Sequence, residues 1–203
     1  MENTAGPKVV GPHDGKAGSL GSIGVRFIID GCEAGERFSL VEHPMAPRHL
    51  AAPLHKHSRE DEYSFVLEGR MGALLGDDVV YAEVGDVVHK PRDQWHTFWN
   101  AGDEPCRILE IISPAGFEKY FDELVDAFAK GPLDPDARRD LAARYGLESQ
   151  PDSIPSLCER FGLEFGPLTA RPRRSTSAPS ATVSKAATRA PVPLPADTER
   201  LGE

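Results

Sequence analysis

The feature that most constrains the fold of this chain is a series of short strand patterns between about residues 23 and 112. Stretches such as "SIGVRFII", "EYSFVL", "RMGALL" and "CRILEIIS" are separated by turn sequences such as "DGCEAG" and "AGDEP". Gly76-Asp77 is typical of a two-residue hairpin. Strands of this length, without helices between them, predict a mainly β fold: an antiparallel sandwich or barrel.

The periodicity changes to that of helices after residue 115. One helical stripe predicts a first helix, and it consists of Phe117, Phe121, Leu124 and Phe128. Asp134 and Pro135 predict the start of a second helix, which Gly146 can end. A third short helix is expected to run toward Gly162.

Two similar octapeptides, "LAARYGLE" at 141–148 and "LCERFGLE" at 157–164, lie within this helical region. Two copies of this length are too short for a repeat architecture. We interpret them as two similar helix ends that pack against the sheet or against a partner subunit.

The two ends of the chain differ in composition from its middle. Residues 166–203 contain no aromatic residue and are rich in Pro, Ala, Ser, Thr and Arg, so they cannot bury enough apolar surface to offset the entropy of ordering. The sequence therefore predicts a flexible N-terminal segment at 1–20, a β-barrel at 21–115, a helical extension at 116–165 and a disordered tail at 166–203.

Charge and cysteine usage limit the partners that we expect. The formal net charge is −9 although the tail is basic, so the body is acidic and is not expected to bind nucleic acid or an anionic membrane. No apolar run approaches the roughly 18 residues of a membrane span, and no secretion signal precedes the strands. Cys32, Cys106 and Cys158 lie far apart, which suits a reducing compartment. We expect a cytoplasmic protein with a small-molecule substrate.

A cluster of histidines and one carboxylate is the candidate functional site of the sequence. On a strand, side chains two residues apart project to one face, so His55 and His57 would point the same way. Glu62 follows after a short break, and His96 is the candidate for a fourth ligand from another strand. Three imidazoles and a carboxylate suit one divalent transition metal ion: manganese, iron, nickel, cobalt or zinc. The alternative is an ordinary polar hairpin.

Other polar and aromatic residues near this cluster receive different assignments. Glu60 and Asp61 are expected to be solvent-facing acids, and the expected rim or surface histidines are His43, His49 and His89. By strand parity Trp99 points away from His96, toward core packing or a subunit interface. The predicted substrate-binding residues are Phe98, Val66 and Asn100.

With these residues the chain resembles the cupin superfamily, in particular single-domain, type-2, quercetinase-like bacterial members. The first motif of that family is matched by His55, His57, Glu62 and Gly69, with four residues between the second histidine and the glutamate and six before the glycine. The second motif is matched by Gly85, Pro91, His96 and Asn100. Two turn positions depart from the family pattern, where His49 and Asp93 stand in place of glycine. Asp tolerates the left-handed backbone conformation better than most residues.

The resemblance implies a double-stranded β-helix, or jelly-roll, barrel with the metal inside. An octahedral ion held by four protein ligands would keep two positions for a bidentate substrate, or for a substrate oxygen together with dioxygen. Glu62 would also serve as a catalytic base when its bond to the metal loosens. The resemblance thus favours a dioxygenase-like oxygenase acting on a small hydroxylated or enolisable molecule, as a homodimer. The alternatives are a non-redox lyase, isomerase or cyclase, and a ligand-binding cupin without catalysis.

Overall fold

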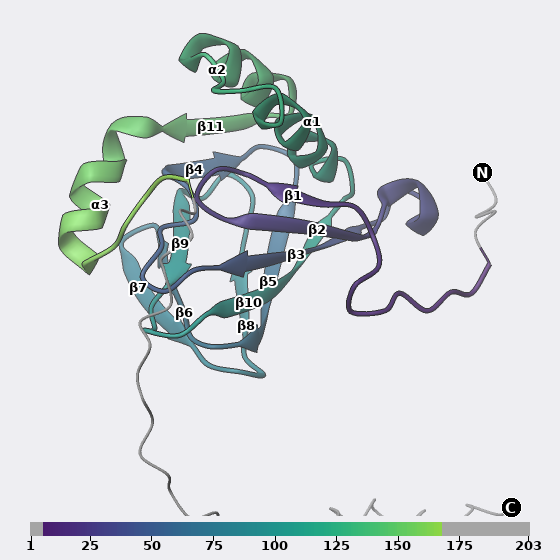
Figure 1. The fold of residues 1–203 in the computed structure, drawn as a ribbon, viewed down its shortest axis with the longest axis horizontal. Coiled ribbons are helices and arrows are strands. Elements are labelled where there is room, and N and C mark those ends of the chain that lie inside the picture. Colours follow the sequence, from purple (N-terminus) through teal and green to yellow (C-terminus); the bar gives the residue numbers. More distant parts are fainter. Residues whose placement is uncertain (1–5, 168–203) are drawn as a thin grey trace, which may run out of the picture. The chain divides into compact units, whose positions relative to one another are not determined.

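The computed structural model describes residues 6–167, and within them two antiparallel β-sheets face each other. The first sheet has the strand order β1 (Ala17–Ser19), β2 (Gly24–Ile29), β3 (Ser39–Met45), β10 (Cys106–Ser113), β5 (Asp61–Glu68) and β8 (Val87–Lys90). The second has the order β11 (Leu147–Gln150), β4 (Leu54–His57), β9 (His96–Asn100), β6 (Met71–Leu75) and β7 (Asp78–Ala82). This arrangement confirms the predicted jelly-roll barrel (Figure 1).

Strand alternation explains why the sheets face each other. In β5 and β10 every second side chain is buried, as the period of two in a half-buried strand requires. The buried row of β10 is Cys106, Ile108, Glu110 and Ile112, and it is apolar except for the glutamate. The hydrophobic core therefore lies between the sheets.

Three α-helices follow the barrel strands, as predicted: α1 (Glu118–Phe128), α2 (Pro135–Arg144) and α3 (Ile154–Phe161). Asp134 caps α2 through its side chain, and Pro135 occupies the first turn. Figure 1 shows α1 and α2 close to β1 and β11, and α3 beyond the other end of β11. Two short 3₁₀ helices, η1 (Gly31–Ala34) and η2 (Pro151–Ser153), complete the elements of the described residues.

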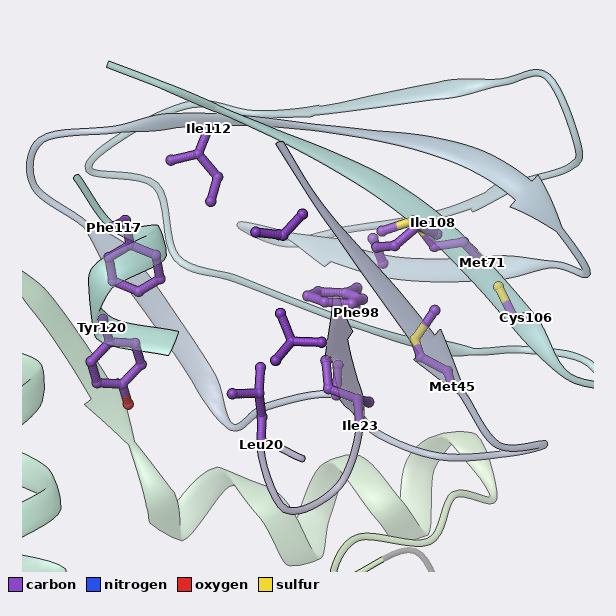
Figure 2. Close-up of a cluster of buried hydrophobic side chains, with 14 of the residues drawn as sticks. Leu20, Ile23, Met45, Met71, Phe98, Cys106, Ile108, Ile112, Phe117 and Tyr120 are labelled. Atoms are coloured by element: carbon purple, nitrogen blue, oxygen red, sulfur yellow. The ribbon is translucent and has the colours of Figure 1, made fainter. Parts of the chain in front are cut away.

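The helices extend the core of the barrel. Phe98 of β9 lies in the middle of a buried cluster, with Met71 and Ile108 to one side and Phe117 and Tyr120 of the α1 segment to the other (Figure 2). Burying an aromatic side chain of this size contributes about 2–3 kcal/mol. A second cluster on the outer face of the five-stranded sheet joins Trp99 to Leu157 of α3.

The extension contains one strand that the sequence did not predict. β11 pairs in antiparallel fashion with β4, so that Leu147 lies opposite His57 and Ser149 opposite His55. The interval 116–165 is therefore not purely helical, and it supplies the edge strand of the barrel sheet that carries three of the candidate ligands.

Other sequence expectations have specific outcomes in the structure. Asp93 has a φ of 62°, the left-handed conformation expected at this glycine position, whereas Arg48 and not His49 has a positive φ at the first turn. β1 lies inside the segment 1–20. The predicted tail falls almost entirely outside the described residues, within which no helix is long and apolar enough to cross a membrane.

Candidate metal centre

The four candidate ligands come from both sheets of the barrel and meet between them. His55 and His57 lie on β4, and His96 begins β9 directly opposite His55 in the strand register. Glu62 reaches the same place from β5 in the other sheet. All four side chains are buried, and none is more than 7% exposed. As predicted from strand alternation, the side chains of His55 and His57 point to the same face of β4.

The donor atoms form a group small enough for one ion. One atom from each of His55, His57, Glu62 and His96 lies within 4.8 Å of the other three. His57 Nε2 and Glu62 Oε1 are 3.5 Å apart, and His96 Nε2 and Glu62 Oε2 are also 3.5 Å apart. Ligands about 2.1 Å from an ion on opposite sides of it are about 4.2 Å apart. The two separations of 3.5 Å lie within this limit and suit donor atoms that share a single metal ion.

Unpartnered nitrogens support the same conclusion. Within residues 6–167 the Nε2 atoms of His57 and His96 are buried and have no hydrogen-bond partner. An unpaired polar atom in a protein interior costs roughly 1–3 kcal/mol, so buried polar groups usually have a partner. A metal ion bound here would give both nitrogens a partner. The four candidate ligands are therefore suited to holding a metal ion.

Backbone carbonyls fix the protonation of two of the histidines. His55 Nδ1 lies 2.8 Å from the carbonyl oxygen of Pro53, and His96 Nδ1 lies 3.0 Å from that of Gln94. A carbonyl can only accept, so Nδ1 carries the hydrogen and Nε2 keeps its lone pair. This is the tautomer that coordinates a metal through Nε2.

The electrostatics of the group also favour a cation. Burial lowers the pKa of His57 to about 4 and that of His55 well below its ordinary value, so both rings are neutral near pH 7. Burial would raise the pKa of Glu62, but the adjacent His57 ring and the positive charge of Lys90 hold that pKa well below its usual range. Neutral imidazoles and an ionised carboxylate are the protonation states that metal ligands need.

The structure contains a buried network of charged residues beside the ligands, which the sequence analysis did not predict. Lys90 Nζ lies 2.9 Å from Glu62 Oε2 and 2.9 Å from Glu110 Oε2, and the hydroxyl of Ser64 donates to the same Glu110 oxygen over 2.8 Å. Burial raises the pKa of Glu110 to about 7. Lys90 and Glu110 could have been found from strand alternation, because each occupies an inward position of a strand whose other inward residues are apolar.

The candidate centre opens into a cavity of about 790 Å³ between the barrel and the extension. His55, His57 and Glu62 line it from the barrel side. The opposite wall is mainly apolar and aromatic, and it includes Phe117, Tyr120, Phe121, Leu124 and Ala142 of the α1 and α2 region. A cavity of this size and lining suits a small organic molecule with few polar groups.

Only one of the three predicted substrate-binding residues lines this cavity. Phe98 does so, whereas Val66 is fully buried in the core and is not part of the cavity wall. Asn100 has a structural role instead, because its side chain bonds to the backbone oxygens of Met45, Ala46 and Glu104 and to the Gly102 amide, and so holds adjoining turns together. Strand parity placed these side chains on the inner face but could not tell cavity from packed core.

Two polar residues near the centre are buried, contrary to expectation. Glu60 is only 5% exposed, and burial raises its pKa to about 7. His43 is 2% exposed and lines the cavity, although it was expected at the rim or surface. Two assignments hold: Trp99 packs against Phe161 on the outer side of the sheet, and His89 is exposed, where it stacks on Tyr63. Asp61, which pairs with Arg92, and His49 are half-buried.

Comparison with known proteins agrees with this geometry. The sequence profile of the cupin domain matches residues 42–112, which include all four candidate ligands. No curated protein matches the chain.

Solved structures of similar fold include KdgF from Halomonas sp., with 14% sequence identity, a TM-score of 0.50 and coverage of 56% of this chain and 99% of that one. A predicted oxalate decarboxylase from Thermotoga maritima is 19% identical, with a TM-score of 0.43 and coverage of 45% and 80%. Pac13, a nucleoside dehydratase from Streptomyces, is 12% identical, with a TM-score of 0.45 and coverage of 56% and 88%. At these identities the likeness to KdgF shows a shared fold.

Proposed function

We propose that the protein, whose residues 42–112 match the cupin-domain profile, is a metal-dependent oxygenase, of the dioxygenase type, that acts on a small hydroxylated or enolisable organic molecule. The observation that carries the proposal is the convergence of His55, His57, Glu62 and His96 within 4.8 Å, beside a cavity of about 790 Å³. A divalent ion held there would act as a Lewis acid and as a template for oxygen-containing substrate groups.

The residues around the ion would have different roles in this proposal. The three histidines would hold the ion in a fixed place because β4 and β9 are paired strands of one sheet. Glu62 would supply negative charge to the ion, and Lys90, whose Nζ lies 2.9 Å from one Glu62 oxygen, fixes the orientation of that carboxylate. The aromatic wall on the α1 side excludes water from the substrate.

The first experiment measures metal content. Protein purified without added metal is analysed by elemental mass spectrometry beside His57→Ala and, as a matched control, His89→Ala, whose side chain is exposed outside the barrel. We expect about one manganese, iron, nickel, cobalt or zinc ion per chain in the wild type and in His89→Ala. His57→Ala is expected to lose at least ten-fold in metal affinity. Wild-type protein that stays metal-free after incubation with all five ions would contradict the proposal.

The second experiment tests the reaction class. Metal-loaded protein is supplied with catechol, a flavonol and acetylacetone, while dioxygen consumption and substrate loss are recorded together. We expect the two to be coupled for at least one compound and to be absent in His57→Ala. Turnover at full rate without dioxygen would contradict an oxygenase.

A non-redox lyase, isomerase or cyclase is the second candidate. The observation in its favour is Glu110, a carboxylate in the cavity lining whose pKa burial raises to about 7. A group that titrates near the working pH suits proton transfer at a substrate carbon. Anaerobic turnover that fails in Glu110→Gln would favour this candidate.

The compartment and the assembly remain predictions. The three cysteines, Cys32, Cys106 and Cys158, are free thiols in the structure, which suits the cytoplasm. The expected homodimer is tested by light scattering of the eluting protein, where a mass of about 22 kDa would instead indicate a monomer.

A further inference from the structure

His43 is a buried histidine of the cavity wall that does not belong to the candidate metal group. It lies on β3, in the inward row with Val41 and Met45, and it is 2% exposed. The same cavity that opens onto His55 and His57 also touches His43. A buried polar side chain between the apolar side chains of Val41 and Met45 is expected to have a hydrogen-bonding or functional role.

One ring nitrogen of His43 has a structural partner, and the other does not. Nδ1 lies 3.0 Å from the carbonyl oxygen of Gly24 on the neighbouring strand β2, so Nδ1 carries the hydrogen. Within residues 6–167 this is the only hydrogen bond of the side chain. Nε2 is thereby left as a lone-pair acceptor, held in a fixed orientation.

Aromatic rings fix the position of this acceptor. The His43 ring meets the Phe121 ring edge-on at a centroid distance of 5.2 Å, and it lies 6.3 Å from the Phe98 ring. Both phenylalanines line the cavity. An acceptor between aromatic rings suits a planar substrate that carries a hydrogen-bond donor.

The charge state of His43 agrees with an acceptor role. Burial lowers its pKa to about 4, so the ring is neutral near pH 7. The Gly24 carbonyl opposes this shift, Lys90 on β8 adds to it, and Glu62 on β5 and Glu42 on β3 oppose it. A neutral ring with Nδ1 hydrogen-bonded presents Nε2 to a donor without placing a positive charge beside the metal centre.

We propose that His43 is a substrate-contacting residue whose Nε2 accepts a hydrogen bond from a hydroxyl group that the substrate does not use to bind the metal. The substrate would then be a planar compound with one metal-binding pair of oxygens and at least one further hydroxyl. This inference rests on the proposed function, since it requires a substrate held at the metal centre.

The test uses three probes on zinc-loaded protein without dioxygen: catechol, pyrogallol and 3-methoxycatechol. All three offer the metal two adjacent oxygens, but only pyrogallol carries a third hydroxyl as a donor. The main variant is His43→Asn, whose side-chain amide can still donate to the Gly24 carbonyl while the Nε2 position is lost. His43→Gln, which can place an acceptor oxygen near the Nε2 position, serves as rescue, and His89→Asn is the matched surface control.

We expect wild-type protein and His89→Asn to bind pyrogallol about five- to ten-fold more tightly than 3-methoxycatechol, as one hydrogen bond provides. In His43→Asn the two affinities should become equal while catechol affinity and zinc content stay unchanged, and His43→Gln should recover part of the preference. Equal affinities in the loaded wild type, or a preference that survives in His43→Asn, would overturn the role of His43. Loss of zinc from the wild type would instead overturn the proposed metal centre.

Discussion

His55 and His96 each donate a hydrogen bond from Nδ1 to the carbonyl of the residue two positions earlier in the sequence. His43 does the same with the carbonyl of Gly24 on the next strand. In all three cases the backbone chooses the tautomer, so that Nε2 points away with a lone pair. Backbone geometry thus prepares these rings before any ligand is bound.

Glu42 provides a prediction on pH dependence away from the candidate centre. Its carboxylate bonds to Arg26 and Arg107 on either side. Burial works against ionisation, but the two guanidinium groups hold the pKa of Glu42 below its ordinary value of 4.5. A lowered folded-state pKa adds stability above pH 4.5, and this stability is lost as the pH falls through the folded value.

We therefore expect Glu42→Gln to lower the free energy of unfolding by about 1 kcal/mol at pH 7, a modest figure because Arg107 is partly exposed. The difference from wild type should shrink below pH 4.5. Urea unfolding at pH 7, 5 and 3.5 measures it. A difference that is the same at all three pH values would show that the ion pairs do not contribute.

Residue-level prediction from the sequence succeeded where spacing carries the information. The distances between His55, His57, Glu62 and His96 along the chain follow a known motif, and these side chains do meet. Lys90, Glu110 and His43 follow no such motif. Strand parity could place Lys90 and Glu110 on inward faces, but their partners there follow from strand register, for example Glu62 opposite Lys90 and Ser64 opposite Glu110, which only the folded sheets define.

At the scale of elements, the two similar octapeptides share one structural design. Each ends a helix at a glycine in the left-handed conformation, Gly146 with φ of 70° and Gly162 with φ of 65°. Each then returns to the barrel: Leu147 begins β11 beside β4, and Glu164 bonds through its backbone to Arg48 and Leu50. The interpretation as helix ends that pack on the sheet is confirmed, and the backbone pairing of the segments that follow, β11 in one copy and an isolated bridge at Glu164 in the other, was not expected.

These two glycines form a matched pair for substitution by alanine. Both changes place a side chain at positive φ, which costs about 1 kcal/mol. A Cβ at Gly162 would meet no atom within 4 Å, whereas one at Gly146 would lie 2.4 Å from Ser58 Oγ. We expect Gly146→Ala to destabilise the protein more than Gly162→Ala, by about a further 1 kcal/mol. Chemical denaturation of both variants measures this, and equal losses would contradict it.

There is a physical reason why β11 was not predicted from the sequence. The sequence "LESQ" is short, polar and mostly exposed, and it lacks the alternation of a half-buried strand. It becomes a strand because β4 offers it an open edge, and pairing is a property of that edge rather than of the segment itself. Helix α1, by contrast, is indicated by an apolar stripe in the sequence, and α2 by Asp134 and Pro135 at its start.

At the scale of the whole molecule, the extension closes the barrel rather than standing apart from it. Phe117, Tyr120 and Leu124 belong to the same buried cluster as Phe98. They also form one wall of the cavity. The family profile ends at residue 112, so this wall lies outside the matched residues.

Truncation tests this closure. A chain ended after Ser113 loses the apolar wall and the partner strand of β4, which leaves a core surface and a sheet edge open to water. We expect it to be insoluble or unfolded. A chain ended after Gly166 keeps both features and should match the full chain in soluble yield and melting temperature. Equal solubility of the two truncated chains would contradict the closing role.

We propose that three histidines and one glutamate hold a single metal ion inside the barrel. An anomalous difference map from crystals of the purified protein, recorded at the absorption edge of the metal that it carries, tests this most directly. We predict one strong peak about 2.0–2.2 Å from His55, His57 and His96 Nε2 and from an oxygen of Glu62. A map without a peak between the sheets, or with a peak that touches fewer than three of these four residues, would contradict the claim.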